Sequence, residues 1–140
     1  MVVHNRVRAH PEDAEAVARV VRSGQWAQGP QVAELERRLA LMAGVRHAVC
    51  VGSGVAALRL SLLGLGVGPG DEVVMPGYCC VALPNAVLSV GAVPRRVDVG
   101  RGSWNLEGAV AGQAAIVVDT FGRPARVDFG VPVIEDCSHA

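Results

Sequence analysis

Apolar residues follow one pattern in the first third of the chain and another in the rest. In the first third they recur at steps of three and four residues, at Val32, Leu35, Leu39 and Met42. This spacing predicts an amphipathic helix, which Gly44 ends. An earlier helix is predicted from Pro11 to about Ser23, because proline and acidic residues favour its first turn and Gly24 follows it.

From residue 47 onward, short continuously apolar runs rich in β-branched residues alternate with helical segments. Strands are predicted at residues 47–51, 72–75, 93–99, 114–119 and 131–135, and helices from about 54 to 65, about 81 to 90 and near 106 to 111. Strands that are apolar along their whole length are typical of a parallel sheet covered on both faces. The predicted fold class is therefore α/β: a mostly parallel sheet with helices on both faces.

Composition narrows the chemistry that this chain can perform. Its 140 residues are 51% hydrophobic, which is enough for a packed core. The 13 basic and 13 acidic residues leave no net charge, so we expect no nucleic-acid partner. All basic residues are arginine, and the sequence contains no lysine. The chain therefore supplies neither the lysine of a Walker-type phosphate loop nor a lysine that forms a Schiff base.

The cysteines and the N-terminus indicate the type of compartment. Cys50, Cys79, Cys80 and Cys137 lack the spacing of a metal site or a disulfide framework, so we interpret them as buried, reduced thiols and expect no metal. The N-terminus lacks the apolar stretch of a signal peptide, and Arg59 interrupts the most membrane-like segment. We therefore expect a cytoplasmic protein with no membrane partner.

A glycine-rich turn lies between the first predicted strand and the following helix. Gly52 and Gly54 flank Ser53 there. Free N–H groups at a helix start favour an anion such as phosphate, and glycines let it approach. The same residues also suit a simple turn, and both interpretations stay open.

The turn also approaches the dinucleotide fingerprint of a Rossmann-type oxidoreductase, with Gly52, Gly54 and Ala57 at the required spacing. That fold uses an acid at the carboxyl end of the second strand to bind ribose. Here Asp71 and Glu72 stand at the beginning of that predicted strand instead. A nucleotide-binding oxidoreductase domain remains an alternative, although the acid that such a domain uses to bind ribose is missing from the expected position.

Polar residues follow two other predicted strands. Glu135, Asp136 and His139 come at the end of a buried strand, the edge at which open α/β sheets bind ligands. A carboxylate there can keep a ring nitrogen protonated, although Asp136 could also cap a helix. Tyr78 and Cys80 follow another strand, where they either contribute to the same site or form a turn.

In order along the chain, these segments resemble the DegT/DnrJ/EryC1/StrS family of pyridoxal-phosphate (PLP)-dependent aminotransferases, many of which aminate keto sugars attached to nucleotides. The similarity runs through residues 24–36, 47–76, 84–99, 104–107, 121–128 and 132–140. It implies a type I, aspartate aminotransferase-like fold, with an N-terminal helical segment at 1–45 and an incomplete PLP-binding large domain at 46–140. It also implies a homodimer, a keto-sugar substrate and an amino-acid donor.

The resemblance assigns cofactor-binding roles position by position. Backbone N–H groups of Gly54, Val55 and Ala56 would bind the PLP phosphate, although the family usually has threonine at Val55. Asp136 would pair with the pyridine nitrogen. His139 stands where the family generally has glutamine, beside the 3-hydroxyl of the ring.

The chain also departs from the family pattern at the residue that stacks on the cofactor ring. Cys80 replaces the aromatic residue that usually stacks on the cofactor ring, and Tyr78 could substitute for it.

The remaining candidates are arginines and tryptophans. The arginines could reach substrate phosphates or form a solvated rim: Arg95, Arg96, Arg123 and Arg126. Trp26 and Trp104 are expected in a core or interface.

The family's Schiff-base lysine lies downstream of the segment that resembles this chain. Without that amine the chain alone is expected to be inactive, because PLP chemistry uses it for covalent and acid–base catalysis. Three hypotheses follow: the N-terminal portion of an aminotransferase, cut short or encoded separately; a non-catalytic binding or regulatory module, or half of a split enzyme; and the Rossmann-type domain described above.

Overall fold

The computed structural model describes residues 8–108 and 110–139. Contacts between Cα atoms divide the chain into two compact units, Met1–Cys50 and Val51–Ala140. The first unit contains α1 (Pro11–Ser23) and α2 (Pro30–Ala43), as predicted from the apolar spacing and from the glycine that follows each helix. Gly24 and Gly44 end these helices in the left-handed conformation, with φ of 69° and 67°.

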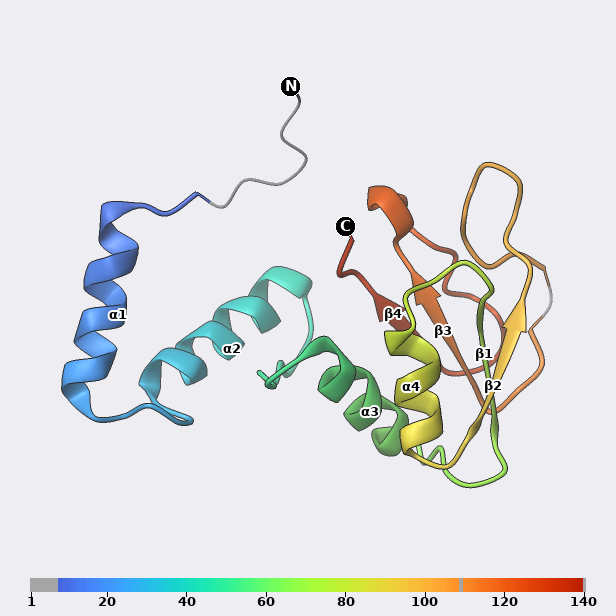
Figure 1. The fold of residues 1–140 in the computed structure, drawn as a ribbon, viewed down its shortest axis with the longest axis horizontal. Coiled ribbons are helices and arrows are strands. Elements are labelled where there is room, and N and C mark those ends of the chain that lie inside the picture. The colour runs from blue at the N-terminus through green and yellow to red at the C-terminus, as the bar shows by residue number, and fades with distance from the viewer. Residues whose placement is uncertain (1–7, 109, 140) are drawn as a thin grey trace. The chain divides into compact units, whose positions relative to one another are not determined.

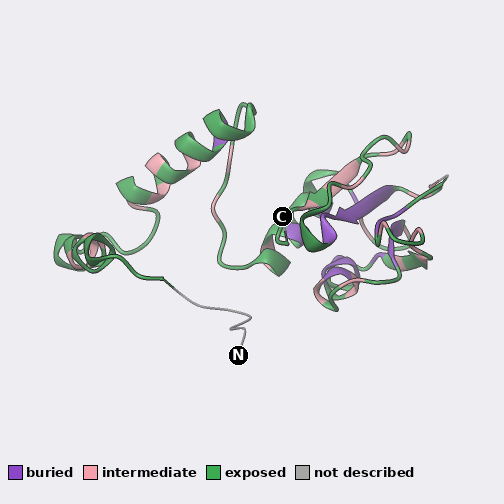
Figure 2. Ribbon diagram, turned by 90° about the horizontal axis from the view of Figure 1, so that it is seen from above, coloured by how far each residue is buried: buried purple, intermediate pink, exposed green. Residues whose placement is uncertain are grey.

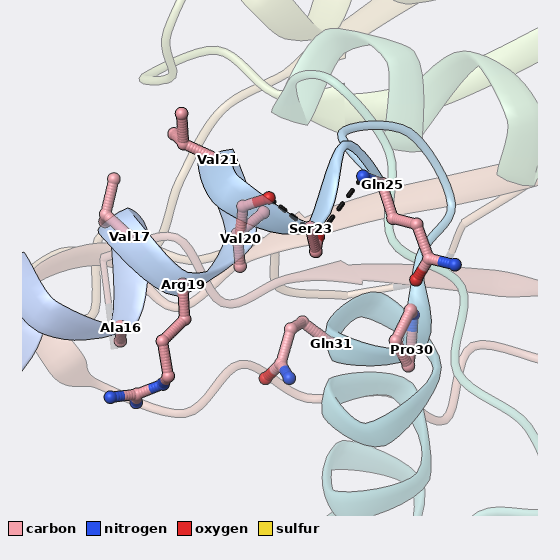
Figure 3. A pocket seen from close by; sticks show the side chains of 9 residues that line it. All are labelled: Ala16, Val17, Arg19, Val20, Val21, Ser23, Gln25, Pro30 and Gln31. Atoms are coloured by element: carbon pink, nitrogen blue, oxygen red, sulfur yellow. Dashed lines mark hydrogen bonds between the residues drawn. The ribbon is translucent and has the colours of Figure 1, made fainter.

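Both helices of the first unit expose their apolar faces within the described residues. Helix α1 has no buried residue and α2 buries only Ala40, and Figure 2 shows both helices in green and pink apart from that position. The hollow between the end of α1 and the start of α2 has a volume of about 570 Å³. Figure 3 shows Val17 and Val21 on α1 beside this hollow, and they are 63% and 56% exposed.

Two ion pairs on one face of α2 stabilise this helix. The Glu34 carboxylate accepts hydrogen bonds from Arg37 at 2.8 Å and from Arg38 at 2.6 Å. These bonds lower the pKa of Glu34 to about 2. Both pairs have the spacing of neighbours on one helix face, so they stabilise the helix without a tertiary partner.

The predicted strand at residues 47–51 is wrong. These residues form no strand and pair with none, and Val49 is 76% exposed. Within residues 8–108 and 110–139, their one long-range hydrogen bond runs from the Cys50 N–H to a Glu36 carboxylate oxygen at 2.8 Å. A β-branched run becomes a strand only when a neighbouring strand accepts and donates its backbone hydrogen bonds.

The second unit is built on a parallel sheet, as predicted. Along the chain come α3 (Gly54–Gly64), β1 (Glu72–Pro76), α4 (Ala82–Ser89), β2 (Val93–Val97), β3 (Ala114–Val118), η1 (Thr120–Gly122) and β4 (Val133–Asp136). The strands lie in the order β2-β1-β3-β4, and every pair is parallel (Figure 1). The chain therefore leaves β1 toward one edge of the sheet and leaves β3 toward the other. Such a reversal opens a crevice at the carboxyl ends of the two central strands.

Side chains of β1 and β3 fill two separate cores, because alternate residues of a strand point to opposite faces. On one face, Val73, Met75 and Ile116 pack against α3 and α4 through Leu62 and Val87. On the other face, Val74 and Val117 pack with Leu106 and with partly buried residues from irregular segments. All of β3 is buried, which agrees with its continuously apolar sequence.

Among the described residues, the α-helices of the second unit lie on one face of the sheet. The predicted helix near 106–111 is wrong. Leu106 instead forms an antiparallel bridge with Val99, and the described residues around it are irregular. Leu106 packs with Val74 and Val117 without a helical turn. No described helix has the length and hydropathy needed to cross a membrane.

Burial separates two leucines of the same helix and supplies a test of the core. Leu62 is fully buried between α3 and the sheet, whereas Leu60 is 54% exposed. We expect Leu62→Ala to lower the free energy of unfolding by about 2–5 kcal/mol and Leu60→Ala to change it by about 0.5 kcal/mol or less. Denaturant unfolding of both variants measures this difference, and equal losses would contradict the packing.

Candidate functional site

Four segments meet at the carboxyl end of the sheet. Residues 77–80 follow β1, residues 119–122 follow β3, and residues 137–139 follow β4. The first turn of α3 lies against the last of these, and Figure 1 shows the ends of the strands at the same side of the sheet as η1. This arrangement follows from the parallel topology, since every strand delivers its carboxyl end to one edge.

Two adjoining cavities open at this edge. The α3 cavity, of about 420 Å³, is lined by the start of α3 and by residues 134–139. The aromatic cavity, of about 350 Å³, is lined by Tyr78 and Phe121 among others. Both cavities share four lining residues: Cys80, Asp136, Ser138 and His139.

Strand alternation places Asp136 at this site. Ile134, two residues earlier, packs against the core that contains α3 and α4, so Asp136 lies on the same face. The strand is in register with β3, where Val118 is the partner of Asp136. One carboxylate oxygen, Oδ1, accepts the N–H of Ser138 at 3.0 Å, which fixes the orientation of the half-buried side chain.

The start of α3 offers unused hydrogen-bond donors. Ser53 caps the helix by accepting the Ala56 N–H at 3.1 Å. Among the bonds of the described residues, none uses the N–H of Gly54 or Val55. A Cβ at Gly52 or Gly54 would meet nothing within 4 Å, so these glycines leave open space in front of the donors.

The structure therefore brings together five of the six residues singled out as cofactor ligands. Gly54, Val55, Cys80, Asp136 and His139 line the α3 cavity. The sixth, Ala56, is absent from the lining, and its N–H is already bonded to Ser53. Ser53, which the residue pattern had placed only in the turn, accordingly competes with any anion for that donor.

The prediction of buried thiols is wrong, because no cysteine is fully buried. Cys80 and Cys137 are exposed, whereas Cys50 and Cys79 are half-buried, and all four are free. Cys80 lies in the segment that follows β1, and Cys137 directly follows β4, so both side chains lie outside the apolar cores. A residue type that usually packs inside is exposed here because the sheet ends before it.

Cys137 lies in a negatively charged cluster with Asp119 and Glu135. Its sulfur and the carboxylate oxygens of Asp119 and Glu135 lie within 4.8 Å of one another. Desolvation raises the pKa of the Cys137 thiol, and its hydrogen bond with Asp119 and the nearby negative charges raise it further. Asp119 is also structural, since its Oδ1 accepts the Ala125 N–H at 2.9 Å.

Three aromatic rings gather beside the aromatic cavity. Ring centroids of Tyr78 and Trp104 are 5.2 Å apart, and those of Trp104 and Phe121 are 6.2 Å apart. Trp104 is 42% exposed and Phe121 is 64% exposed. Trp104 is therefore not a core residue, and neither is Trp26 at 75% exposure, so of the two expected positions only an interface remains for them. Phe121 was not singled out because no spacing rule relates residues of separate loops.

The arginines divide into two environments. Arg95 forms an ion pair with Glu72 at 3.7 Å and donates to the Ala111 carbonyl at 2.8 Å. Arg123 donates to the Gly102 carbonyl, at the loop that also carries Trp104. Arg123 is therefore engaged at the loop that carries Trp104, whereas Arg95 is engaged at the strands of the sheet.

Comparison with known proteins identifies the family of this chain. The profile of the DegT/DnrJ/EryC1/StrS aminotransferase family matches residues 8–140. The chain belongs to this family. A curated relative, UDP-2-acetamido-2-deoxy-3-oxo-D-glucuronate aminotransferase of Pseudomonas aeruginosa, is 38% identical over 139 residues, covering 89% of this chain and 39% of the relative.

Solved structures of family members and related aminotransferases have the same fold. S. venezuelae DesV, in complex with a ketimine intermediate, superposes with a TM-score of 0.83 at 34% identity, over 89% of this chain and 38% of DesV. NtdA from Bacillus subtilis, with bound cofactor PMP, gives a TM-score of 0.81 at 27% identity, over 88% of this chain and 32% of NtdA. This member of the aminotransferase family thus spans less than half the length of these relatives.

The charges around Cys137 predict how its reactivity depends on pH. Replacing Asp119 with asparagine removes one negative charge while retaining an oxygen for the Ala125 N–H. We expect the pKa of Cys137 to fall, so that the thiolate forms at lower pH and alkylation at mildly alkaline pH becomes a few-fold faster. Peptide mass spectrometry of iodoacetamide-treated protein over a range of pH gives the profile.

Glu135→Gln is the matched control for the Asp119→Asn variant. The Glu135 charge raises the pKa of Cys137 less than desolvation and the Asp119 hydrogen bond do, so its removal should shift the alkylation profile by a smaller amount. Identical profiles for Asp119→Asn and the parent chain would show that Asp119 does not control this thiol.

Proposed function

We propose that this chain forms the PLP-binding part of an aminotransferase that acts on a keto sugar linked to a nucleotide, with an amino acid as donor. One observation supports it most: the free N–H groups of α3 and the carboxylate of Asp136 line one cavity of about 420 Å³. PLP has a phosphate at one end and a ring nitrogen at the other. A helix start and a carboxylate are complementary to these two groups.

The start of α3 fits the phosphate. The N–H groups of Gly54 and Val55 are unused, the helix dipole favours negative charge there, and the space before Gly54 is open. Ser53 contributes either its hydroxyl or, by releasing Ala56, a third N–H. Val55 contributes only its backbone, because its side chain carries no hydrogen-bonding group.

Asp136 fits the ring nitrogen. A carboxylate next to a pyridine nitrogen raises the pKa of that nitrogen and keeps it protonated. The bond from Ser138 N–H fixes the carboxylate, so its free oxygen can accept a hydrogen bond from the protonated ring nitrogen. His139 lies in the same cavity, where it can bond the ring hydroxyl. Cys80 offers the ring a small apolar contact in place of a stacked aromatic side chain.

When bound, PLP supplies an electron sink for amino transfer. This chain's residues bind the cofactor, orient it and keep its ring nitrogen protonated. None of the 140 residues is a lysine, so we propose that the chain alone does not complete transamination. Substrate, donor and a homodimeric partner are proposed for the complete enzyme by its resemblance to the family.

Binding of PLP to the purified chain tests the proposal through Asp136. We expect saturable binding that Asp136→Asn weakens about 10- to 100-fold, because a hydrogen bond to a charged group contributes roughly 1.5–3 kcal/mol. Equilibrium dialysis with PLP measures the affinity. Asp128→Asn, at an exposed loop position, should leave it unchanged.

Two results would contradict this assignment of the cofactor site. One is the absence of saturable PLP binding to the chain, and the other is equal affinity of the Asp136→Asn variant and the parent. NAD serves as the comparison ligand, because saturable binding of NAD in place of PLP would favour the Rossmann-type alternative.

A gain of affinity tests the phosphate end separately. Val55 is 40% exposed and lines the cavity, so Val55→Thr adds a hydroxyl beside the unused N–H groups. We expect PLP to bind up to about tenfold more tightly to this variant, whereas pyridoxal, which lacks the phosphate, should bind as it does to the parent. An equal gain for both ligands would mean that the hydroxyl does not contact the phosphate.

A further inference from the structure

The aromatic cluster of Tyr78, Trp104 and Phe121 is assembled from three loops at the carboxyl end of the sheet. The rings contact one another at centroid distances of 5.2, 6.2 and 6.4 Å. Tyr78 is 50% exposed, and the other two rings are comparably open. Rings that served only to fill a core would be covered, whereas these present their surfaces to whatever occupies the adjoining cavity.

Two members of the aromatic cluster adopt a backbone conformation that bulky residues avoid. Trp104 and Phe121 have φ of 61° and 58°, and Gln28 is the one other non-glycine residue with positive φ in residues 8–108 and 110–139. Left-handed backbone at an aromatic residue is strained, and such strain is concentrated at ligand sites. Turning either residue to an ordinary conformation would take its ring away from the cluster.

Asn105 ties the two strained loops together. It is 6% exposed, and its side-chain amide donates to the carbonyls of Arg123 and Pro124, both at 3.2 Å. Trp104 precedes Asn105 and Phe121 precedes Arg123 by two residues, so these bonds fix the separation of the two rings. Asn105 is therefore a positioning residue for the aromatic cluster.

The surroundings of the cluster select one class of ligand. Arg123 donates to the Gly102 carbonyl, so its guanidinium lies at the loop that also carries Trp104. Tyr78 and Phe121 also line the cavity that contains Asp136 and His139. A ligand that met all of these groups would carry a flat aromatic group, an anionic group and a third portion that reaches the cofactor site.

We infer that the aromatic cluster binds the base of a nucleoside diphosphate by stacking, with the diphosphate beside Arg123 and the attached sugar in the aromatic cavity. This inference rests on the proposed function and adds to it the residues that recognise the nucleotide. Every base has a flat π-face, so stacking requires no hydrogen-bond match, and a stacked base strengthens binding by roughly 10- to 100-fold. The guanidinium matches phosphate oxygens in geometry and charge.

Tryptophan fluorescence provides a direct test in the full chain without PLP. The chain has two tryptophans, so Trp26→Phe leaves Trp104 as the sole reporter. We expect UDP to quench its fluorescence saturably, uridine to do so at higher concentration, and pyrophosphate to cause little quenching. Quenching by UDP at the same concentrations as pyrophosphate would overturn base stacking, because charge alone would then explain it.

Phe121→Leu separates stacking from apolar contact. Leucine keeps apolar volume but lacks a π-face, so UDP should bind roughly tenfold more weakly while thermal melting shows a folded chain. Val127→Ala is the matched control, since Val127 is 51% exposed in the same region of sequence, and should bind UDP as the parent does. Unchanged UDP affinity in Phe121→Leu, or no UDP binding to the parent, overturns the inference.

Failure of this inference can be distinguished from failure of the proposed function. Normal PLP binding without UDP binding would reject the stacking site alone. UDP binding that depends on Phe121, without PLP binding, would support the stacking site and reject the proposed cofactor site. Loss of both would reject both proposals.

Discussion

The site depends on one constraint: β3 is buried along its whole length and hydrogen-bonded on both sides. Its five residues can be apolar throughout because β1 and β4 pair with its edges while two cores cover its faces. A buried backbone needs hydrogen-bond partners, and β4 pairs with residues 115–118 of β3 while β1 pairs with residues 114 and 115. Those strands are parallel, and their carboxyl ends therefore meet where β3 ends.

The polar groups of the chain gather where this burial stops. Asp119 and Asp136 come directly at the ends of β3 and β4, and the Asp119 N–H donates to the Asp136 carbonyl at 3.0 Å. Alternation then sends the two carboxylates to opposite faces. Asp136 faces the cavity beside α3, whereas Asp119 ties down the following loop and raises the pKa of Cys137. The two acids therefore have different roles, because their side chains point to opposite faces of the sheet.

The loops beyond the sheet carry the conformational strain. Trp104 and Phe121 have left-handed backbone, and the buried amide of Asn105 connects their segments. The apolar cores below stabilise the second unit without these rings, which explains how the loops can remain strained. A rigid sheet with strained loops at one edge is a common arrangement for ligand sites.

Local sequence determined the helices, the central strands and the positions of the chemistry-bearing residues. Helix periods, proline and glycine signals located α1, α2 and α3, and continuous apolar runs located β1 and β3, because these signals act over a few residues. Asp136 could be singled out because a carboxylate directly after a buried strand lies at the ligand-binding edge. The family pattern also identified Gly54 and Val55 as candidate phosphate ligands.

Tertiary structure decided everything that depends on partners distant in sequence. Residues 47–51 have strand-forming side chains but no pairing strand, and Leu106 finds its place in a core beneath β1 and β3 without a helix. Cys80 and Cys137 are exposed because the sheet ends before them, and Tyr78, Trp104 and Phe121 meet only when three loops fold over one edge. Propensity and periodicity are properties of neighbouring residues, whereas strand pairing, burial and ring contacts arise between segments that only folding brings together.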